Sequence, residues 1–97
     1  MEMLELNIMK SISYTKPDKN FWKNKSVLVT GHNGFKGSWL SLWLLNMNAQ
    51  VSGLSLENEQ HNNLFDQLKI KNNLNHIICD IRDKDALKNN IQKIKPD

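Results

Sequence analysis

The 97-residue chain has few residues that crosslink a chain or interrupt helices and strands, with one cysteine, two prolines and four glycines. The lone Cys79 excludes an internal disulfide, and no group of cysteines and histidines has the spacing of a metal site, so we expect no metal. No apolar run approaches the roughly 20 residues that a membrane helix needs. The N-terminus has neither the basic start nor the cleavage site of a signal peptide. These absences predict a cytoplasmic protein that does not enter a membrane.

The excess of positive charge is small and evenly spread. The net charge is +3, with a pI near 9.1, and lysines are interleaved with acidic residues along the chain. A surface that binds nucleic acid would more often combine a basic stripe with exposed aromatic residues. We therefore expect no nucleic-acid partner. The length suffices for one small domain and is far below that of a complete dinucleotide-binding enzyme.

Three of the four glycines follow the spacing G-x-x-G-x-x-G, at Gly31, Gly34 and Gly37. The run Ser26–Thr30 before them is apolar and β-branched and predicts a buried strand. Phe35–Met47 after them predicts a helix. In this context Gly31 permits a tight turn, Gly34 lets a pyrophosphate approach the backbone, and Gly37 lets the helix pack closely on the strand. The pattern indicates a dinucleotide-binding loop.

Charged residues extend this pattern. The helix start offers unpaired N–H groups to phosphates, and Lys36 adds a positive charge there. A second strand is predicted at Gln50–Leu56, and Glu57 follows it at the distance expected for a ribose-binding acid. Such an acid repels a 2′-phosphate, so NAD is favoured over NADP. The competing interpretation is an ordinary glycine turn with Glu57 as a solvated strand end.

The rest of the chain predicts a short helix around Leu64–Leu68, a strand at about His76–Cys79 and a helix from about Lys84 to Lys95. Asp80 and Ile81 then lie at the strand end where ligands bind in open α/β sheets. Asp80 can accept a hydrogen bond from an adenine amino group, and Ile81 can offer its backbone and an apolar contact.

The predicted fold class is α/β, the N-terminal half of a doubly wound parallel sheet. Strand two lies beside strand one with strand three beyond it, and a fourth strand belongs on the other side of strand one. We expect residues 1–19 to form a poorly ordered extension and residues 20–97 a partial NAD-binding domain that stops before the fourth strand. Gly53 marks a close approach by a neighbouring loop, by adenosine or by ordinary packing.

The first long helix is expected to turn one broad apolar face toward the sheet. The residues expected on that face are Trp39, Leu40, Trp43, Leu44 and Met47. Those expected on the opposite face are Ser38, Ser41 and Asn48.

The string TGHNGFKGSWLSLWL resembles the CDP-glucose 4,6-dehydratase family of extended short-chain dehydrogenases/reductases. NFWKNKSVLVT, VSGLSLE, LFDQL and DIRD also resemble that family in order, so the likeness covers about Asn20 to Asp97. The resemblance implies an NAD-dependent lyase that removes a hydride from C4 of CDP-glucose, eliminates water across C5 and C6, and returns the hydride to C6. Its product, CDP-4-keto-6-deoxyglucose, serves surface-polysaccharide synthesis. The resemblance also implies a homodimer when the protein is full length.

The resemblance assigns residues of this chain only to the cofactor. The implied cofactor-binding residues are Gly31, Gly34, Phe35, Lys36, Gly37, Glu57, Asp80 and Ile81. The family's catalytic Tyr-x-x-x-Lys pair is absent, because the only tyrosine is Tyr14 and Asp18 stands four residues later. We therefore expect no catalytic residue here and an inactive isolated chain. The alternatives are another extended dehydrogenase, such as an epimerase or a different dehydratase, and a non-catalytic nucleotide-binding remnant.

Overall fold

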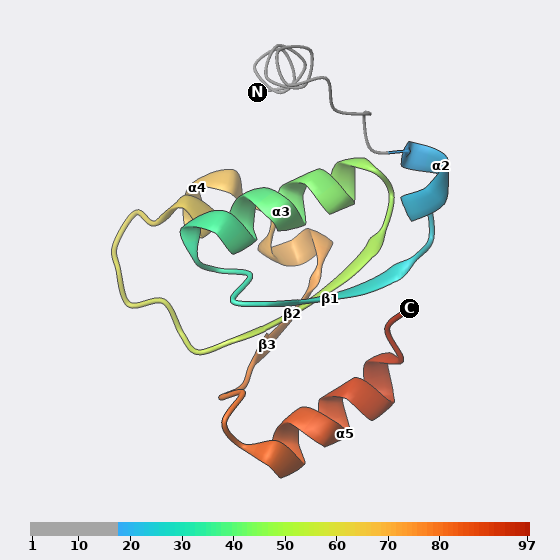
Figure 1. The fold of residues 1–97 in the computed structure, drawn as a ribbon. Helices are drawn as coiled ribbons and strands as arrows, with labels where there is room; N and C mark the ends of the chain where they lie inside the picture. Colours follow the sequence, from blue (N-terminus) through green and yellow to red (C-terminus); the bar gives the residue numbers. More distant parts are fainter. Residues whose placement is uncertain (1–17) are drawn as a thin grey trace, which may run out of the picture.

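The computed structural model describes residues 18–97 (Figure 1). Most of the extension expected at residues 1–19, namely 1–17, lies outside the described residues. Asp18 caps a short helix, α2 (Lys19–Trp22), by accepting a 2.8 Å hydrogen bond from the main-chain N–H of Asn20. The domain boundary expected at Asn20 therefore falls inside this helix.

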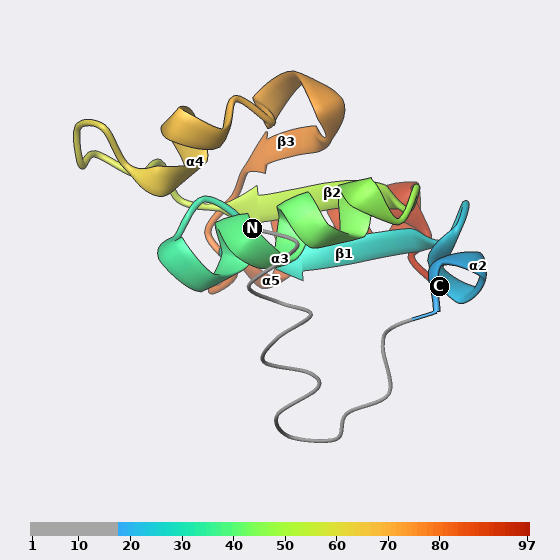
Figure 2. The same ribbon diagram turned by 90° about the horizontal axis from the view of Figure 1, so that it is seen from above.

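Three parallel strands form the sheet, in the order β1-β2-β3 (Figures 1 and 2). The strands are β1 (Ser26–Thr30), β2 (Gln50–Ser55) and β3 (Asn75–Ile78). They alternate with helices, so the predicted α/β class and strand order are confirmed. β2 is the central strand and is buried along most of its length, as a strand covered on both faces should be.

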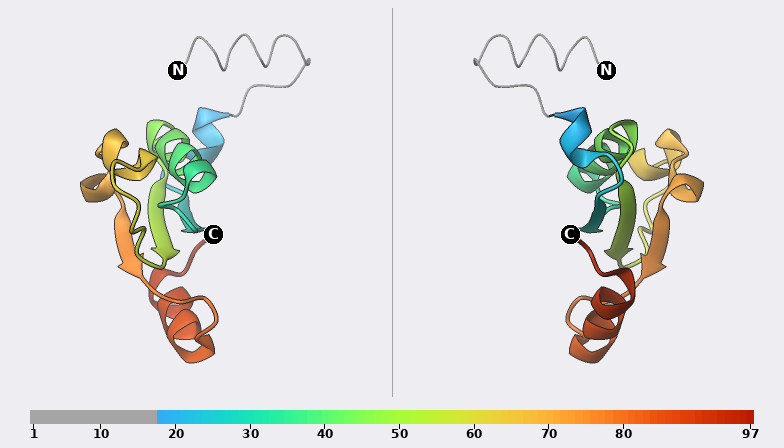
Figure 3. Two further views of the ribbon diagram at one scale, coloured as in Figure 1. Left: turned by 90° about the vertical axis from the view of Figure 1, so that its left-hand side faces the viewer. Right: turned by 90° about the vertical axis from the view of Figure 1, so that its right-hand side faces the viewer.

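The two long helices lie on opposite faces of the sheet (Figures 1 and 3). α3 (Phe35–Asn46) covers one face, together with the short α4 (Leu64–Leu68) and the 3₁₀ turn η1 (Lys71–Asn73). α5 (Lys84–Ile94) lies on the other face. Within residues 18–97 no helix has both the length and the apolar content that crossing a membrane takes.

The buried core lies between α3 and the sheet. Its members are the apolar residues Val29, Leu44, Met47, Ala49 and Val51. Trp22 and Trp43 are partly buried against this cluster. This cluster therefore forms on the α3 face, whereas α5 contributes no buried residue.

The expected sheet-facing side of α3 was wrong in part. Ser38 and Ser41, placed opposite the sheet by the helical projection, are fully buried, and Leu40 is 47% exposed. Nearly every side of α3 is apolar, so the period of the sequence does not select one face. Packing selects it instead: two small hydroxyl side chains beside Gly37 allow the helix to approach the sheet closely. The hydroxyl of Ser38 donates to the main-chain carbonyl of His32 at 3.1 Å.

After α5 the chain returns to β1. The N–H of Asp97 donates to the carbonyl of Ser26 at 2.7 Å, and the N–H of Ser26 donates to the Asp97 carboxylate at 2.8 Å. Directly before β1 the carbonyl of Lys25 accepts from the N–H of Gln50 in β2, so the main-chain polar groups of the next residue, Ser26, point to the other edge of the strand. Asp97 therefore lies at the β1 edge where the sequence predicts a fourth strand.

Candidate cofactor site

The carboxyl ends of the three strands bring together the residues predicted to bind the cofactor. Gly31 directly follows β1, Glu57 follows β2 after one intervening residue, and Asp80 follows β3 in the same way. In open parallel sheets this edge holds the ligand. Three segments that are well separated in the sequence thus meet at one edge.

The glycine loop forms a tight turn between β1 and α3. Gly31 has a positive φ of 72°, a conformation that favours glycine. Its N–H donates to the carbonyl of Leu54 in β2 at 2.8 Å, and its own carbonyl accepts from Gly34 at 3.1 Å. These bonds fix the loop to the central strand, as the tight-turn prediction for Gly31 requires.

The other two glycines of the motif differ in what the fold demands of them. A Cβ at Gly37 would overlap the main-chain carbonyl of Gly31 and crowd the Cα of His32, so the predicted close packing at this glycine is confirmed. A Cβ at Gly34 would lie 3.4 Å from the Gly31 oxygen, which is an ordinary contact, and φ there is −79°. The fold therefore requires glycine at position 37 and tolerates a side chain at position 34.

The start of α3 offers unsatisfied donors at this edge. Gly34 is the N-cap and supplies no side-chain hydrogen bond to the first turn. Among residues 18–97, the main-chain N–H groups of Phe35, Lys36 and Gly37 donate a hydrogen bond to no acceptor. Phe35 is 69% exposed, and Lys36 is also exposed. A helix N-terminus with open N–H groups and a nearby cation is suited to bind a phosphate.

The acidic residues at this edge differ in their surroundings. Glu57 is exposed and forms no ion pair within the described residues. The Asp80 carboxylate accepts from the Arg82 guanidinium at 2.7 Å and from the Arg82 N–H at 2.9 Å. These hydrogen bonds lower the pKa of Asp80 to about 2, so it is anionic at neutral pH. The sequence did not predict the ion pair of Arg82 with Asp80. Ile81, which lies between Asp80 and Arg82, is 52% exposed.

A pair of histidines, one buried and one partly buried, joins the glycine loop to β3. The ring of His32 is fully buried, and its Nε2 lies 2.6 Å from Nδ1 of His76 at β3. A Cβ at Gly53 would overlap the His32 ring, so this glycine makes room for the neighbouring loop, one of the three roles left open by the sequence. Phe65 stacks on His76 and meets His32 edge-on. The pair was not foreseen, because 44 residues separate its members.

Burial keeps both imidazoles neutral. The pKa of His32 falls to about 4, chiefly because a buried imidazolium loses its hydration, and also because His76 is close; a weaker interaction with the Leu54 main chain opposes the shift. Burial and the charge of Lys71 lower the pKa of His76, while Glu57 acts in the opposite direction. At neutral pH one ring can therefore donate its single N–H to the other. No group of three possible metal ligands occurs among residues 18–97.

The histidine pair should make stability depend on pH. Unfolded His32 gains its proton near pH 6.5 and folded His32 only near pH 4, so the unfolded state binds more protons between these values. The free energy of unfolding should thus be unaffected above pH 6.5 and should fall by about 3 kcal/mol as the pH drops to 4. Urea unfolding of wild type and His32→Gln at a series of pH values measures this loss.

The exposed His61 provides the matched control for this experiment. His61→Gln should keep the wild-type pH profile, whereas His32→Gln should make the loss of stability at low pH smaller. Equal profiles for wild type and His32→Gln would show that His32 titrates alike in both states.

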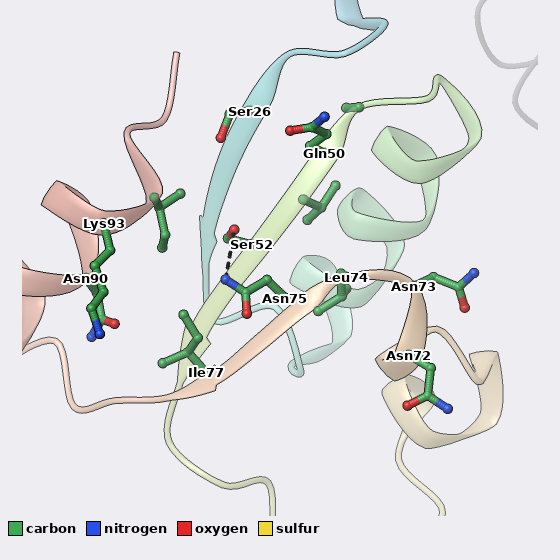
Figure 4. Close-up of a pocket in the computed structure, with 13 residues that line it drawn as sticks. Ser26, Gln50, Ser52, Asn72, Asn73, Leu74, Asn75, Ile77, Asn90 and Lys93 are labelled. Atoms are coloured by element: carbon green, nitrogen blue, oxygen red, sulfur yellow. Dashed lines mark hydrogen bonds between the residues drawn. The ribbon is translucent and has the colours of Figure 1, made fainter.

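One large pocket among the described residues does not coincide with this edge. It has a volume of about 880 Å³ and lies between α5 and the amino-terminal half of the sheet (Figure 4). Ser26, Gln50 and Asn75 line it, and none of the predicted cofactor residues does. The helix on this side, α5, contributes no buried residue. In parallel sheets ligands bind at the carboxyl edge, not here. We therefore place the candidate site at the carboxyl edge.

Comparison with known proteins shows the family of the chain. The sequence profile of GDP-mannose 4,6 dehydratase matches residues 28–97. The chain is also 49% identical over 80 residues to CDP-glucose 4,6-dehydratase from Salmonella typhimurium, a match that covers 82% of this chain and 22% of that protein. The chain thus spans about a fifth of the length of this relative. With three parallel strands, a glycine loop and two acidic strand ends at one edge, the chain belongs to the GDP-mannose 4,6 dehydratase family of sugar-nucleotide dehydratases.

Proposed function

We propose that this chain is the NAD-binding part of a sugar-nucleotide 4,6-dehydratase that converts CDP-glucose to CDP-4-keto-6-deoxyglucose. The observation that carries the proposal is the glycine loop: it leaves open donors at α3 beside a glycine, Gly34, that the fold itself does not require. The choice of CDP-glucose rests on the 49% identity to an enzyme of that name. The product would serve the synthesis of deoxysugars for surface polysaccharide.

Each part of the site has a distinct task in this proposal. The N–H groups at the start of α3 and the charge of Lys36 bind the pyrophosphate. Glu57 accepts hydrogen bonds from the ribose hydroxyls, while Asp80 and Ile81 contact the adenine. Bound NAD would supply a reversible hydride acceptor for the sugar. This chain holds and orients the cofactor, and the catalytic Tyr-x-x-x-Lys segment would belong to a part of the enzyme outside it.

Cofactor preference gives a direct test. NAD should bind the full-length protein at least tenfold more tightly than NADP, because the exposed Glu57 carboxylate repels a 2′-phosphate. Glu57→Ser should reduce this preference to about threefold or less. Isothermal titration of both dinucleotides measures the preference.

The neighbouring acid Glu59 is the control for this test, since it is also exposed and Glu59→Ser changes the net charge equally. That variant should retain the wild-type preference. Equal affinity of wild type for NAD and NADP would contradict the role of Glu57.

With CDP-glucose as substrate, the holoenzyme should form a product that is lighter by one water. Turnover of GDP-mannose instead would favour a different dehydratase.

A further inference from the structure

Two asparagines join the glycine loop to the loop that carries Glu57. The side-chain nitrogen of Asn33, in the glycine loop, donates to the carbonyl of Leu56 at 2.8 Å. The side-chain nitrogen of Asn58 donates in the opposite direction, to the carbonyl of Asn33, at 2.9 Å. Each loop thus supplies one side-chain donor and one main-chain acceptor. We call these two hydrogen bonds the amide strap.

The amide strap spans two parts of the candidate site. Asn33 directly precedes Gly34, the N-cap of α3, where the proposed function places the pyrophosphate. Leu56 and Asn58 directly flank Glu57, where it places the ribose. The two bonds therefore fix the separation between the phosphate donors and the ribose acceptor.

The Asn58 amide is engaged at both ends, and the Asn33 amide donates from a buried position. Asn33 is only 8% exposed. The oxygen of Asn58 accepts from the N–H of Gln60 at 3.1 Å, while its nitrogen bonds Asn33. An asparagine side chain has one acceptor oxygen and one donor nitrogen, so both ends of Asn58 are engaged by the protein. These side chains hold the two loops together.

We infer that Asn33 and Asn58 are positioning residues for the dinucleotide, setting the distance between the phosphate loop and Glu57 so that one ligand reaches both. The inference rests on the proposed function, because it takes NAD as the ligand. A ligand that fills both parts of the site benefits from a fixed distance, since its second contact forms at little further cost in entropy. A ligand that fills only the Glu57 side gains nothing from it.

The test compares NAD with adenosine in the full-length protein. Asn58→Ala should weaken the affinity for NAD about tenfold, because one hydrogen bond between the loops is lost. The same variant should bind adenosine within about twofold of wild type. Asn33→Ala should act in the same way. Because both bonds hold the same two loops, the double variant should lose less than the product of the two single effects. Calorimetry measures NAD, and ligand-observed NMR measures adenosine.

Asn63 offers a matched control. It is as buried as Asn33, at 7% exposed. Its side-chain nitrogen donates to the carbonyl of Gln60 at 2.8 Å and to the Asp66 carboxylate at 3.0 Å, and its oxygen caps α4. Among the described residues it forms no hydrogen bond to the glycine loop. Asn63→Ala should lower the urea midpoint of unfolding and keep the wild-type affinity for NAD. If Asn58→Ala weakens NAD no more than Asn63→Ala, or weakens adenosine as much as NAD, the inference is wrong while NAD binding by wild type still stands. A wild type that binds no NAD would overturn both the inference and the proposed function.

Discussion

Gly37→Ala should unfold the domain or destabilise it by about 3 kcal/mol or more, the upper end of the cost of overpacking a core. The added Cβ would overlap the main-chain carbonyl of Gly31 and approach the Cα of His32. Both are backbone atoms in a turn that is fixed to β2 by a 2.8 Å hydrogen bond, so no flexible side chain can move aside. The helix would have to lift away from the sheet and open the core beneath Ser38 and Ser41. Urea unfolding and far-UV circular dichroism of the full-length protein measure the loss.

Gly34→Ala is the matched control, three residues earlier in the same loop. Its Cβ would lie at an ordinary 3.4 Å from the Gly31 oxygen, and its φ of −79° suits any residue. This variant should lower the free energy of unfolding by no more than about 1 kcal/mol. Similar destabilisation by both alanines would show that α3 does not rest on the glycine turn as described.

Gly34→Val should weaken the affinity for NAD by about 100-fold or more in a protein that still folds. At φ −79° and ψ 178° valine is compatible with the backbone, so the fold should survive. Its two methyl groups would cover the space above the open N–H groups of Phe35 and Lys36, and the pyrophosphate could not reach them. Loss of several charge-assisted hydrogen bonds accounts for the size of the effect.

Isothermal titration with NAD measures this loss, and adenosine serves as the internal control. Adenosine lacks phosphates and should bind Gly34→Val as it binds wild type, through the Glu57 side of the site. Retention of NAD affinity within a few-fold would refute the phosphate-loop assignment. Loss of both ligands together with a lowered unfolding midpoint would point to a folding defect at Gly34.

Local sequence patterns determined most of the secondary structure. A β-branched run predicted β1 at Ser26–Thr30, the residues observed. The end of α3 was expected one residue later than observed, and β3 starts at Asn75, one residue before the predicted start. The glycine spacing also defined two structural roles, the positive φ at Gly31 and the close contact at Gly37. Such features depend on a few neighbouring residues, so they can be read without knowledge of the fold.

The candidate edge follows from the same reasoning one step further. Once three parallel strands are in order, their carboxyl ends must share one edge, which places Glu57 and Asp80 near Gly31. The sequence could predict this proximity because topology alone requires it. It could not predict that Arg82 engages Asp80, because that contact depends on the conformation of the turn after β3.

Only the tertiary structure decided which side chains meet across the loops. The face that α3 turns to the sheet depends on the size of Ser38 and Ser41, since small side chains permit an approach that the apolar pattern does not encode. The contact of His32 with His76 and the amide strap from Asn33 to Asn58 join residues far apart in the chain. Strand register and loop shape select these partners. The sequence by itself therefore determined which residues lie at the candidate edge, and tertiary packing determined the contacts that hold that edge in place.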